Sequence, residues 1–358
     1  MNTSVAKSKE DPIFVGCDDG HDSVKIVART LNDKSEMTRL TLPSKIVRGS
    51  RAVSLTSDSA PEGVYSAGDE IFTVSDALTG SDVLDTRAIG FPTHKINRIL
   101  VQDGMIRAGL AGKTVHLVTG LPVNDYYKDA KLNEALIASK KLNICDADIK
   151  ALSGEEVVKI VDHRVACEAI AAVYDMAICD DGTDNVDFFK LLEMAPVGVI
   201  DIGGKTTDLA VVYLSNGMPQ VDMARTSSLD YGMLRVAEQI KRELQIAHKV
   251  DEISPRALYK VMAERRVVLY GKDTDVSASV ALALTKVLPD LFDRIRASWG
   301  NAQDLAKVIV VGGGAYLLAD EIKNSLYPHA ETKKEPEYAN ARGMLKLAMR
   351  SHLQNARG

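Results

Sequence analysis

The 358-residue chain is predicted to be an α/β protein built from two related halves, and three observations support this class. Short apolar strands alternate with helical stretches, which is typical of a mostly parallel sheet. A strand, an acidic glycine turn and a second strand occur at Asp18-Asp19-Gly20 and again 183 residues later, from 18 to 201, at Asp201-Ile202-Gly203. The length corresponds to about two domains of roughly 150 residues each. Two such halves would hold a ligand in the cleft between them.

Composition and charge are those of an ordinary soluble protein. Lys and Arg total 44 and Asp and Glu total 49, and the net charge of −5 argues against a basic nucleic-acid-binding face. The four cysteines form no C-x-x-C pair, so zinc and dithiol redox chemistry are not expected. Residues 1–12 are predicted to be a disordered leader and no signal peptide, and no apolar run reaches the roughly 18 residues of a membrane span. We therefore expect a cytoplasmic protein without membrane association.

The first half of the chain mixes regular and irregular segments. It opens with the hairpin 13–28, and a Ser-, Gly- and Asp-rich region with short β-like pieces follows over 38–90. The apolar spacing then predicts helices at 93–111 and 125–142, strands at 114–119 and 157–161, and an Ala-rich helix that opens on Glu168. A polar loop is expected at 180–187.

The second half is more regular. A buried strand at 197–200 leads into the second acidic hairpin, which ends near 213. The remaining pattern predicts helices at 231–248, 254–266, 277–298 and 315–325, a buried strand at 308–311, and a closing helix at 338–353.

The first acidic turn is a candidate phosphate loop. Its glycine lets backbone N–H groups approach an anion, Asp18 could hold a water bound to Mg²⁺, and Lys25 could neutralise phosphate oxygens. The alternative is a hairpin tip with solvated charges, because Asp-Gly hairpins are common.

The second acidic turn, from Asp201 to Asp208, is the stronger candidate. Two glycines, two hydroxyls and two carboxylates follow a fully apolar strand, which suits a backbone phosphate cradle with Asp201 and Asp208 near a metal ion. A plain hairpin is the alternative, and it is less favoured because nearly every residue of the turn suits phosphate.

Two further features are ambiguous when taken alone. The strand 308–311 runs into three glycines and a helix start, which would form a backbone platform or simply a strand–helix turn, and it is no dinucleotide fingerprint. Glu168 is either a first-turn glutamate favoured by the helix dipole or a carboxylate that positions or deprotonates an attacking water.

The order and spacing of these elements resemble the actin-like ATPase superfamily, and within it the plasmid-segregation actins of the ParM/StbA family. The wider superfamily shares the DxGGxTxD turn at 201–208 and the VGGGA segment at 311–315. The narrower resemblance rests on Thr119-Gly120-Leu121-Pro122 with Tyr126-Tyr127, and on the segment 338–344, Y-A-N-A-R-G-M. Together with Glu168-Ala169-Ile170-Ala171-Ala172 and 228–232, S-L-D-Y-G, these motifs span the chain from about 14 to 348.

The resemblance implies an actin-like, ribonuclease-H-like duplicated fold of two lobes with a central nucleotide cleft between them. Lobe I would hold residues 13–190 with the closing helix 338–353, and lobe II would hold 195–335. It implies ATP or GTP with Mg²⁺ as cofactors, Glu168 and Asp201 as catalytic residues, and Asp18 and Asp201 as metal ligands through water. The implied nucleotide-binding residues are Asp18, Gly20, His21, Asp22, Ser23, Lys25, Gly203, Gly204, Lys205, Thr206, Thr207, Asp208, Gly232, Gly312, Gly313, Gly314 and Ala315.

Two positions depart from the usual family pattern, and two others are assigned on helix position alone. His21 stands where the family usually has Ser or Thr, and Lys205 replaces a more usual small residue, which affects the detail of phosphate contact and leaves the fold unaffected. Glu264 and Arg265 are purine-contact candidates on helix position alone.

The function implied is nucleotide-driven assembly of a head-to-tail filament, with hydrolysis of ATP or GTP, that partitions plasmid DNA. DNA would be reached through a small DNA-binding adaptor and not directly. The alternatives are a small-molecule kinase of the same superfamily, another bacterial actin-like cytoskeletal filament, a chaperone-type regulator and a non-catalytic binding module. A chaperone-type regulator would be expected to carry a further client domain of about 150 residues. The region 38–90, with Lys45, Arg48 and Arg51, is expected at a subunit contact, or else as a solvated surface insertion.

Overall fold

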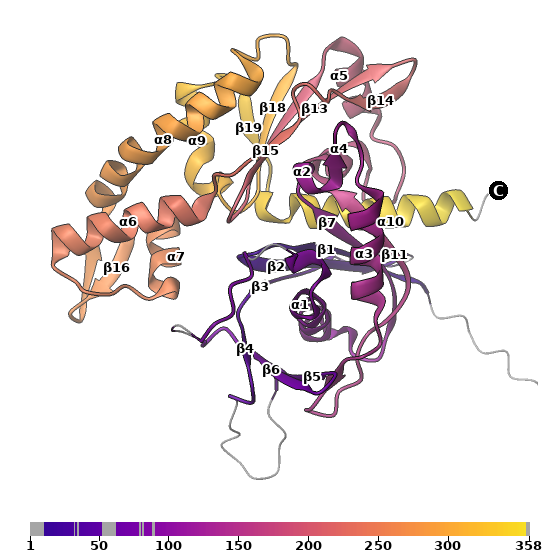
Figure 1. Ribbon diagram of the computed structural model, residues 1–358. Helices are drawn as coiled ribbons and strands as arrows, with labels where there is room; N and C mark the ends of the chain where they lie inside the picture. The colour runs from indigo at the N-terminus through magenta and orange to yellow at the C-terminus, as the bar shows by residue number, and fades with distance from the viewer. Residues whose placement is uncertain are drawn as a thin grey trace, which may run out of the picture.

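The computed structural model describes residues 11–31, 33, 36–51, 62–78, 80, 82–87 and 90–355 of the chain. Two lobes, each built on a central sheet, lie beside one another (Figure 1). The expected leader lies almost entirely outside the described residues. The α/β class and the two-lobed organisation are confirmed.

The sheet of lobe I has five strands in the order β11 (Lys159–Cys167), β7 (Thr114–Leu121), β1 (Ile13–Asp19), β2 (Ser23–Thr30) and β3 (Thr38–Pro43). The first three are mutually parallel, whereas β2 runs antiparallel to both of its neighbours. Consecutive buried residues in β1 reflect coverage on both faces, as expected for a strand at the parallel centre of a sheet.

The sheet of lobe II repeats this arrangement with the strands β19 (Ala330–Thr332), β18 (Lys307–Val311), β12 (Val197–Ile202), β13 (Thr207–Ser215) and β14 (Met218–Val221). Its central strand β12 is again parallel to one neighbour and antiparallel to the hairpin partner, and the short strand β15 (Ser227–Leu229) also pairs with β13. The duplication that the two hairpins predicted therefore extends to both whole sheets.

The β-containing region predicted at 38–90 has two parts. Strand β3 completes the main sheet, while β4 (Ile46–Arg48), β5 (Val64–Ala67) and β6 (Glu70–Val74) join β10 (Lys150–Ala151) in a separate four-stranded sheet. Residues 52–61 of this region lie outside the described residues.

The helix expected at 125–142 is wrong in its first half. The chain instead forms a single turn, α2 (Val123–Tyr126), then a small hairpin of β8 (Tyr127–Lys128) and β9 (Lys131–Leu132), and only then α3 (Glu134–Cys145). Asp129 and Ala130 adopt left-handed φ angles of 51° and 57° at the hairpin turn, which a helix cannot contain. Asn133 then starts α3, because its side chain accepts a hydrogen bond from the backbone N–H of Leu136.

The other lobe I helices are α1 (Lys95–Met105), which follows a 3₁₀ turn at Phe91–Thr93 and continues as a π-helical turn at Ile106–Leu110, α4 (Ile170–Ala177) and the closing helix α10 (Ala339–Asn355). Helix α10 packs on β1 and on α4. Glu168 does not open α4 but sits in the turn before it, since Ala169 has a left-handed φ of 59°.

Helix α5 (Val186–Met194) overlaps the polar loop predicted at 180–187. Asn185 caps it by accepting hydrogen bonds from the backbone N–H groups of Asp187 and Phe188. Phe188 and Leu192 pack into the apolar cluster that includes Val197 and Val212 of the lobe II sheet. A helix so close to the proposed lobe boundary at 190 therefore packs against lobe II, and the boundary itself stays a prediction.

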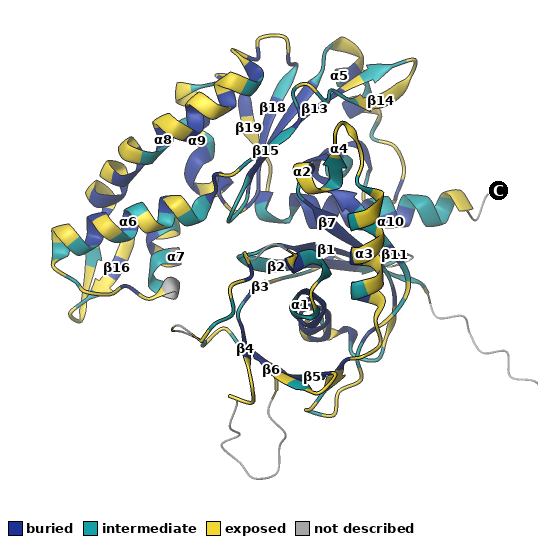
Figure 2. Cartoon of the chain, in the orientation of Figure 1, coloured by how far each residue is buried: buried dark blue, intermediate teal, exposed yellow. Residues whose placement is uncertain are grey.

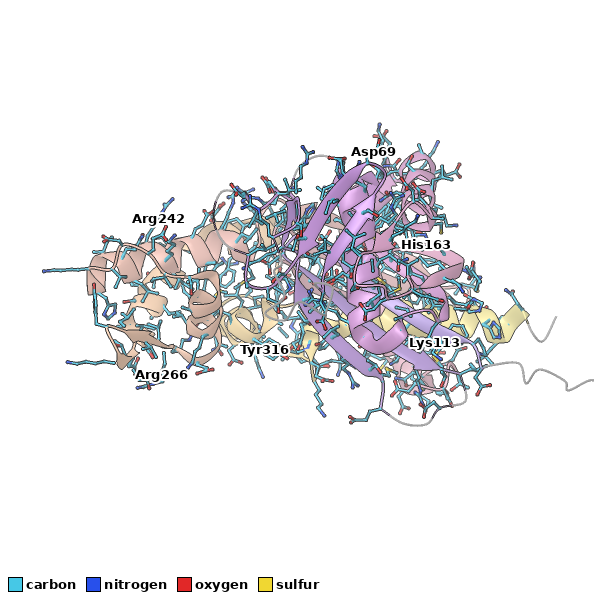
Figure 3. The ribbon with its side chains drawn as sticks, turned by 90° about the horizontal axis from the view of Figure 1, so that it is seen from below. Asp69, Lys113, His163, Arg242, Arg266 and Tyr316 are labelled. Atoms are coloured by element: carbon cyan, nitrogen blue, oxygen red, sulfur yellow. The ribbon has the colours of Figure 1, made fainter. Side chains whose placement is uncertain are left out.

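Lobe II also contains α6 (Met233–His248), α7 (Pro255–Glu264), the hairpin of β16 (Arg266–Leu269) and β17 (Lys272–Asp275), α8 (Ser277–Trp299) and α9 (Ala315–Ser325), with a 3₁₀ turn at Pro336–Tyr338 before α10. The central strands are buried, and exposed residues gather on the outer faces of the helices (Figure 2). Seen from below, Arg242 and Arg266 lie on lobe II, and Asp69, Lys113 and His163 lie on lobe I (Figure 3). Among the described residues, no helix is long and apolar enough to cross a membrane.

Candidate nucleotide and metal site

The two repeated hairpins point their turns at one cavity between the lobes. In the first hairpin Asp18 lies opposite Lys25, and in the second Asp201 lies opposite Asp208. Residues of both turns line the same cavity, together with the turn that contains Glu168. The sequence repeat therefore brings two acidic strand ends face to face.

The first hairpin contributes a buried ion pair. Lys25 Nζ lies 2.9 Å from Asp18 Oδ2, and both side chains are almost fully buried. Burial alone would lower the pKa of Lys25, but the adjacent Asp18 carboxylate outweighs it and raises that pKa, so the ammonium group stays charged. The charges of Asp18 and Lys25 thus neutralise one another in the cavity wall.

His21 anchors the first turn to lobe I. Its Nδ1 is hydrogen-bonded to the carbonyl oxygen of Thr86, and the Thr86 hydroxyl donates back to the His21 carbonyl oxygen at 2.5 Å. The imidazole also contacts the ring of Phe91, with 5.0 Å between ring centroids. Burial lowers the pKa of His21, so it is a neutral structural contact at neutral pH.

The second hairpin carries two buried carboxylates that face each other. Asp201 Oδ2 accepts a 2.6 Å hydrogen bond from Nδ2 of Asn340. Burial, and then repulsion by Asp18 and Asp208, nevertheless raises the pKa of Asp201 to about 7.

Asp208 is held by three donors that come from both lobes. Its carboxylate accepts hydrogen bonds from the backbone N–H of Val123, from the Thr206 hydroxyl, and from the Ser228 hydroxyl. Burial still raises its pKa. In the second hairpin a carboxylate, and not a cation, therefore lies opposite Asp201, while Lys205 of the turn donates to the carbonyl oxygen of Arg87 at 3.4 Å.

Glu168 adds a further carboxylate to the cavity wall. It lies in the turn between β11 and α4, and its backbone N–H donates to the carbonyl oxygen of Leu121 at 2.8 Å. Burial, and then the charges of Asp18, Asp208 and Asp201, raise its pKa well above the usual range. The cavity wall thus holds more carboxylates than lysines, and an added cation would help to neutralise the excess: the carboxylates are Asp18, Asp19, Asp22, Glu168, Asp201 and Asp208, and the lysines are Lys25, Lys140 and Lys205.

The donor chemistry fits a hydrated Mg²⁺ ion. Carboxylate oxygens are the ligands that Mg²⁺ prefers, and this ion usually keeps several of its waters. Within the described ranges, no group of three His, Cys, Asp or Glu residues is placed to hold a metal ion directly. The arrangement therefore suits a metal held through water and through the phosphates of a ligand.

Most of the residues predicted for the site line this cavity: Asp18, Gly20, His21, Asp22, Ser23, Lys25, Glu168, Asp201, Gly203, Gly204, Lys205, Thr206 and Asp208. Thr207 does not, because its side chain is buried and its hydroxyl donates to the carbonyl oxygen of Tyr231 at 2.7 Å. Gly232 packs behind the second turn, against the backbone of Gly204 and Lys205.

The glycine segment before α9 supports the site from behind. Gly312 has a left-handed φ of 82°, and a Cβ at that position would collide with Oδ1 of Asp201. Gly314, whose N–H donates to the carbonyl oxygen of Ile202, likewise contacts the second hairpin. Gly312, Gly313, Gly314 and Ala315 are absent from the cavity wall.

The two purine-contact candidates lie away from the carboxylate cavity. Arg265 lines a separate groove of about 600 Å³ between α8 and α9, with Glu321 on the opposite side. Glu264 is exposed and is absent from the lining of both cavities.

Several lining residues were not predicted from the sequence. Asn340, Asp19 and Lys140 supply polar contacts, and the wall is completed by Phe91, Pro92, Gly120, Leu121 and Pro122. Asn340 lies within the 338–344 motif, and Gly120 to Pro122 within the 119–122 motif, so both motifs held a signal for the site. Lys140 lies on a charged helix with no motif, and only the tertiary structure reveals it.

Two family models match this chain. "Plasmid segregation protein ParM, N-terminal" (StbA) matches residues 13–179, and "Archaeal actin homologue MreB-like, C-terminal" matches residues 199–324. A curated archaeal actin homologue of Thermoplasma volcanium is 27% identical over 157 residues, which are 43% of this chain. That match spans about half of the relative's own length, at 47%.

Solved structures share the fold over nearly the whole chain. A 15-stranded ParM filament from Clostridium botulinum has a TM-score of 0.73 at 18% identity, covering 94% of this chain and 99% of that one. The actin-like protein Alp7A has a TM-score of 0.74 at 16% identity, covering 97% of each chain. The archaeal actin homologue Ta0583 in complex with ADP has a TM-score of 0.70 at 17% identity, covering 94% and 99%.

Proposed function

We propose that this chain, which has the actin-like fold and resembles the ParM/StbA and archaeal actin homologues, binds ATP or GTP with Mg²⁺ in the cavity between its lobes and hydrolyses it. The observation that carries this proposal is the set of buried carboxylates at the ends of two repeated hairpins and at Glu168. The pKa values of Asp201, Asp208 and Glu168 are raised. The relative solved with ADP supports it.

Each turn has a distinct part in the reaction. Backbone N–H groups of Gly20 to Ser23 and of Gly203 to Thr206 would hold phosphate oxygens, and Lys25 would balance their charge. Asp18 and Asp201 would hold Mg²⁺ through water, and the ion would neutralise charge that develops on the transferred phosphoryl group.

Glu168 would orient the attacking water. It is buried beside the phosphate loops, and a positioned general base contributes about 10²–10⁴-fold in rate. Burial and the neighbouring aspartates raise its pKa, and a bound Mg²⁺ ion would lower that pKa and favour the ionised carboxylate, which can accept a hydrogen bond from the water. The Asn340 amide, which donates to Asp201, would keep that carboxylate turned toward the metal waters.

We further propose that nucleotide binding drives head-to-tail assembly into a cytoplasmic filament that partitions plasmid DNA through a small DNA-binding adaptor. Contacts from both lobes converge on Asp208, so the ligand state of the cavity can bias how the lobes sit. A head-to-tail contact that does not close into a ring propagates as a filament. The filament structure of the ParM relative supports this part of the proposal.

Phosphate release and assembly test the two parts separately. Wild-type protein mixed with ATP–Mg²⁺ or GTP–Mg²⁺ is expected to release phosphate and to scatter light at right angles, and electron microscopy should show filaments. Formation of ADP or GDP that a small hydroxyl substrate accelerates, with the phosphoryl group recovered on that substrate and no pelleting, would support the kinase alternative. Absence of phosphate release with either nucleotide would contradict hydrolysis.

A further inference from the structure

A buried ion pair forms part of the wall of the carboxylate cavity. Lys140 on α3 and Asp19 at the end of β1 are only 2% and 1% exposed, and Lys140 Nζ lies 2.7 Å from Asp19 Oδ2. Removing two charges from water costs more than their attraction returns unless further hydrogen bonds complete the site. Such a pair is therefore weak evidence for stability by itself, and its other contacts indicate what it does.

Both members of the pair hold the same residue, Gly120 at the end of β7. Asp19 Oδ1 accepts a hydrogen bond from the Gly120 N–H at 3.3 Å, and Lys140 Nζ donates to the Gly120 carbonyl oxygen. Asn97 completes the arrangement by donating to Asp19 Oδ2 at 2.7 Å. The backbone of Gly120 is thus fixed on both of its polar groups by charged partners, which form stronger hydrogen bonds than neutral ones.

Gly120 is in turn the surface against which Glu168 rests. A Cβ at position 120 would lie 2.8 Å from Glu168 Oε1 and 2.9 Å from Glu168 Cγ, so even a methyl group would displace the carboxylate. The opposite side of that space is closed by Cε of Met344 at 2.7 Å. A shift of the Gly120 backbone would therefore move the wall that sets the position of Glu168.

We propose that Lys140 and Asp19 are a positioning pair for hydrolysis: they fix Gly120 and, through it, the orientation of the Glu168 carboxylate. This inference rests on the proposed hydrolytic function and names two residues that act through the backbone of Gly120. Lys140 is also the cation that opposes the rise in the pKa of Glu168 caused by burial and by the three aspartates.

The principal test replaces Lys140 by Met, with Lys141→Met as the matched control. Lys141 is the exposed neighbour on the same helix, so the control makes the same chemical change without touching the pair. Because a misplacement of about 1 Å can cost about 100-fold in rate, K140M is expected to lower kcat by about 10- to 100-fold with KM little changed. K141M is expected to match wild type, and equal kcat values for K140M and K141M would overturn the inference.

The double variant K140M/E168Q tests whether Lys140 acts through Glu168. If it does, K140M lowers kcat no further in the E168Q background, because the carboxylate that it positions is already gone. A full multiplicative loss in the double variant would show an independent role for Lys140 and would overturn the inference.

The variant D19N/K140M separates positioning from folding. Neutralising both partners leaves no lone buried charge, so it is expected to restore the thermal stability that K140M alone loses. The Gly120 carbonyl still lacks its donor, so kcat is expected to stay low. Recovery of kcat together with stability would assign the pair a purely structural role. If wild-type protein released no phosphate, both proposals would be wrong, whereas an active wild type with a fully active K140M would contradict only the pair's role.

Discussion

The two hairpins that face the cavity have the same backbone and opposite electrostatics. Lys25 in the first and Asp208 in the second occupy equivalent positions, each opposite a strand-end aspartate. In the first hairpin Asp18 therefore has a cation at 2.9 Å, and in the second Asp201 faces a second carboxylate. The duplicated fold thus places a cation opposite the strand-end aspartate of the first hairpin and a carboxylate opposite that of the second. This difference makes the second hairpin suited to the metal ion of a bound nucleotide.

Replacing Glu168 by Gln should have the largest effect, because Glu168 is the residue that would orient the attacking water. It lies in neither hairpin, so the substitution leaves both phosphate loops unchanged. Phosphate release is expected to fall by about 10²–10⁴-fold, while nucleotide affinity persists because the phosphate loops are intact. Phosphate release and equilibrium nucleotide binding are measured on the same preparation. Filaments of E168Q should form and then fail to disassemble, and an unchanged hydrolysis rate would remove Glu168 from the mechanism.

Replacing Lys25 by Met would remove the cation that lies opposite Asp18 in the first hairpin. Removing one partner of a buried pair leaves an uncompensated charge, so the free energy of unfolding should fall by about 3 kcal/mol. Urea denaturation without nucleotide measures it. The double variant D18N/K25M should recover much of the loss, and a change below about 1 kcal/mol in K25M would show that the pair is not balanced as described.

The second hairpin should make stability depend on pH near neutrality, because Asp201 has a carboxylate and no cation opposite it. The pKa of Asp201 is raised from 3.8 to about 7 in the folded protein, so the folded state holds a proton that the unfolded state has lost. Stability without ligand should therefore fall as pH rises from about 4 to about 7, by at most about 4 kcal/mol from this residue. Asp201→Asn should flatten part of this slope, while Glu168 and Asp208 contribute in the same direction. Equal slopes in D201N and wild type would contradict the assignment.

The same Asp201→Asn variant should also weaken the response to Mg²⁺. With one fewer carboxylate to hold the metal waters, the Mg²⁺ concentration that gives half-maximal phosphate release should rise by about 10- to 100-fold. Asp230→Asn is a suitable control, because Asp230 is an exposed aspartate near the second hairpin that does not line the cavity. An identical Mg²⁺ dependence in D201N and D230N would place the metal elsewhere.

Charge reversal on the surface that the sequence predicts at a subunit contact should have the smallest effect on the cavity. Arg48 and Arg51 are exposed and pair with Glu70 at 3.6 Å and Asp82 at 2.8 Å, and Lys45 is half-buried. Exposed pairs of this kind contribute little to stability, about 0–1 kcal/mol. Reversing all three charges should raise the critical concentration for pelleting and leave monomer nucleotide affinity unchanged. Normal pelleting of this triple variant would count against the surface as a contact.

Residue spacing was sufficient to predict the parts of the site that are local in sequence. The acidic turns at Asp18 and Asp201, with their flanking strands, are where the alternation of apolar and acidic residues indicated, and each turn lies within one hairpin. The two hairpins, which lie 183 residues apart, also predicted the two-lobed fold, because two similar hairpins in one chain indicate two similar sheets.

Contacts that depend on tertiary packing were not predictable in the same way. Lys140 has the sequence surroundings of a solvated helix residue, and only the packing of α3 against β11 and α1 buries it next to Asp19. Asn340 reaches Asp201 across 139 residues of sequence. Helix α5 was missed because its start depends on a single capping asparagine inside an acidic stretch.

Nucleotide affinity with and without Mg²⁺ tests the central claim most directly, because a cavity lined by six carboxylates and three lysines should bind phosphate groups tightly only together with a further cation. Calorimetric titration of ATP and GTP into wild-type protein at pH 7 is carried out once with Mg²⁺ and once with EDTA. The account predicts binding of at least one nucleotide that weakens by at least about tenfold when Mg²⁺ is removed, which corresponds to about 1.4 kcal/mol. Equal affinity in the two conditions, or no binding of either nucleotide with Mg²⁺ present, would contradict it.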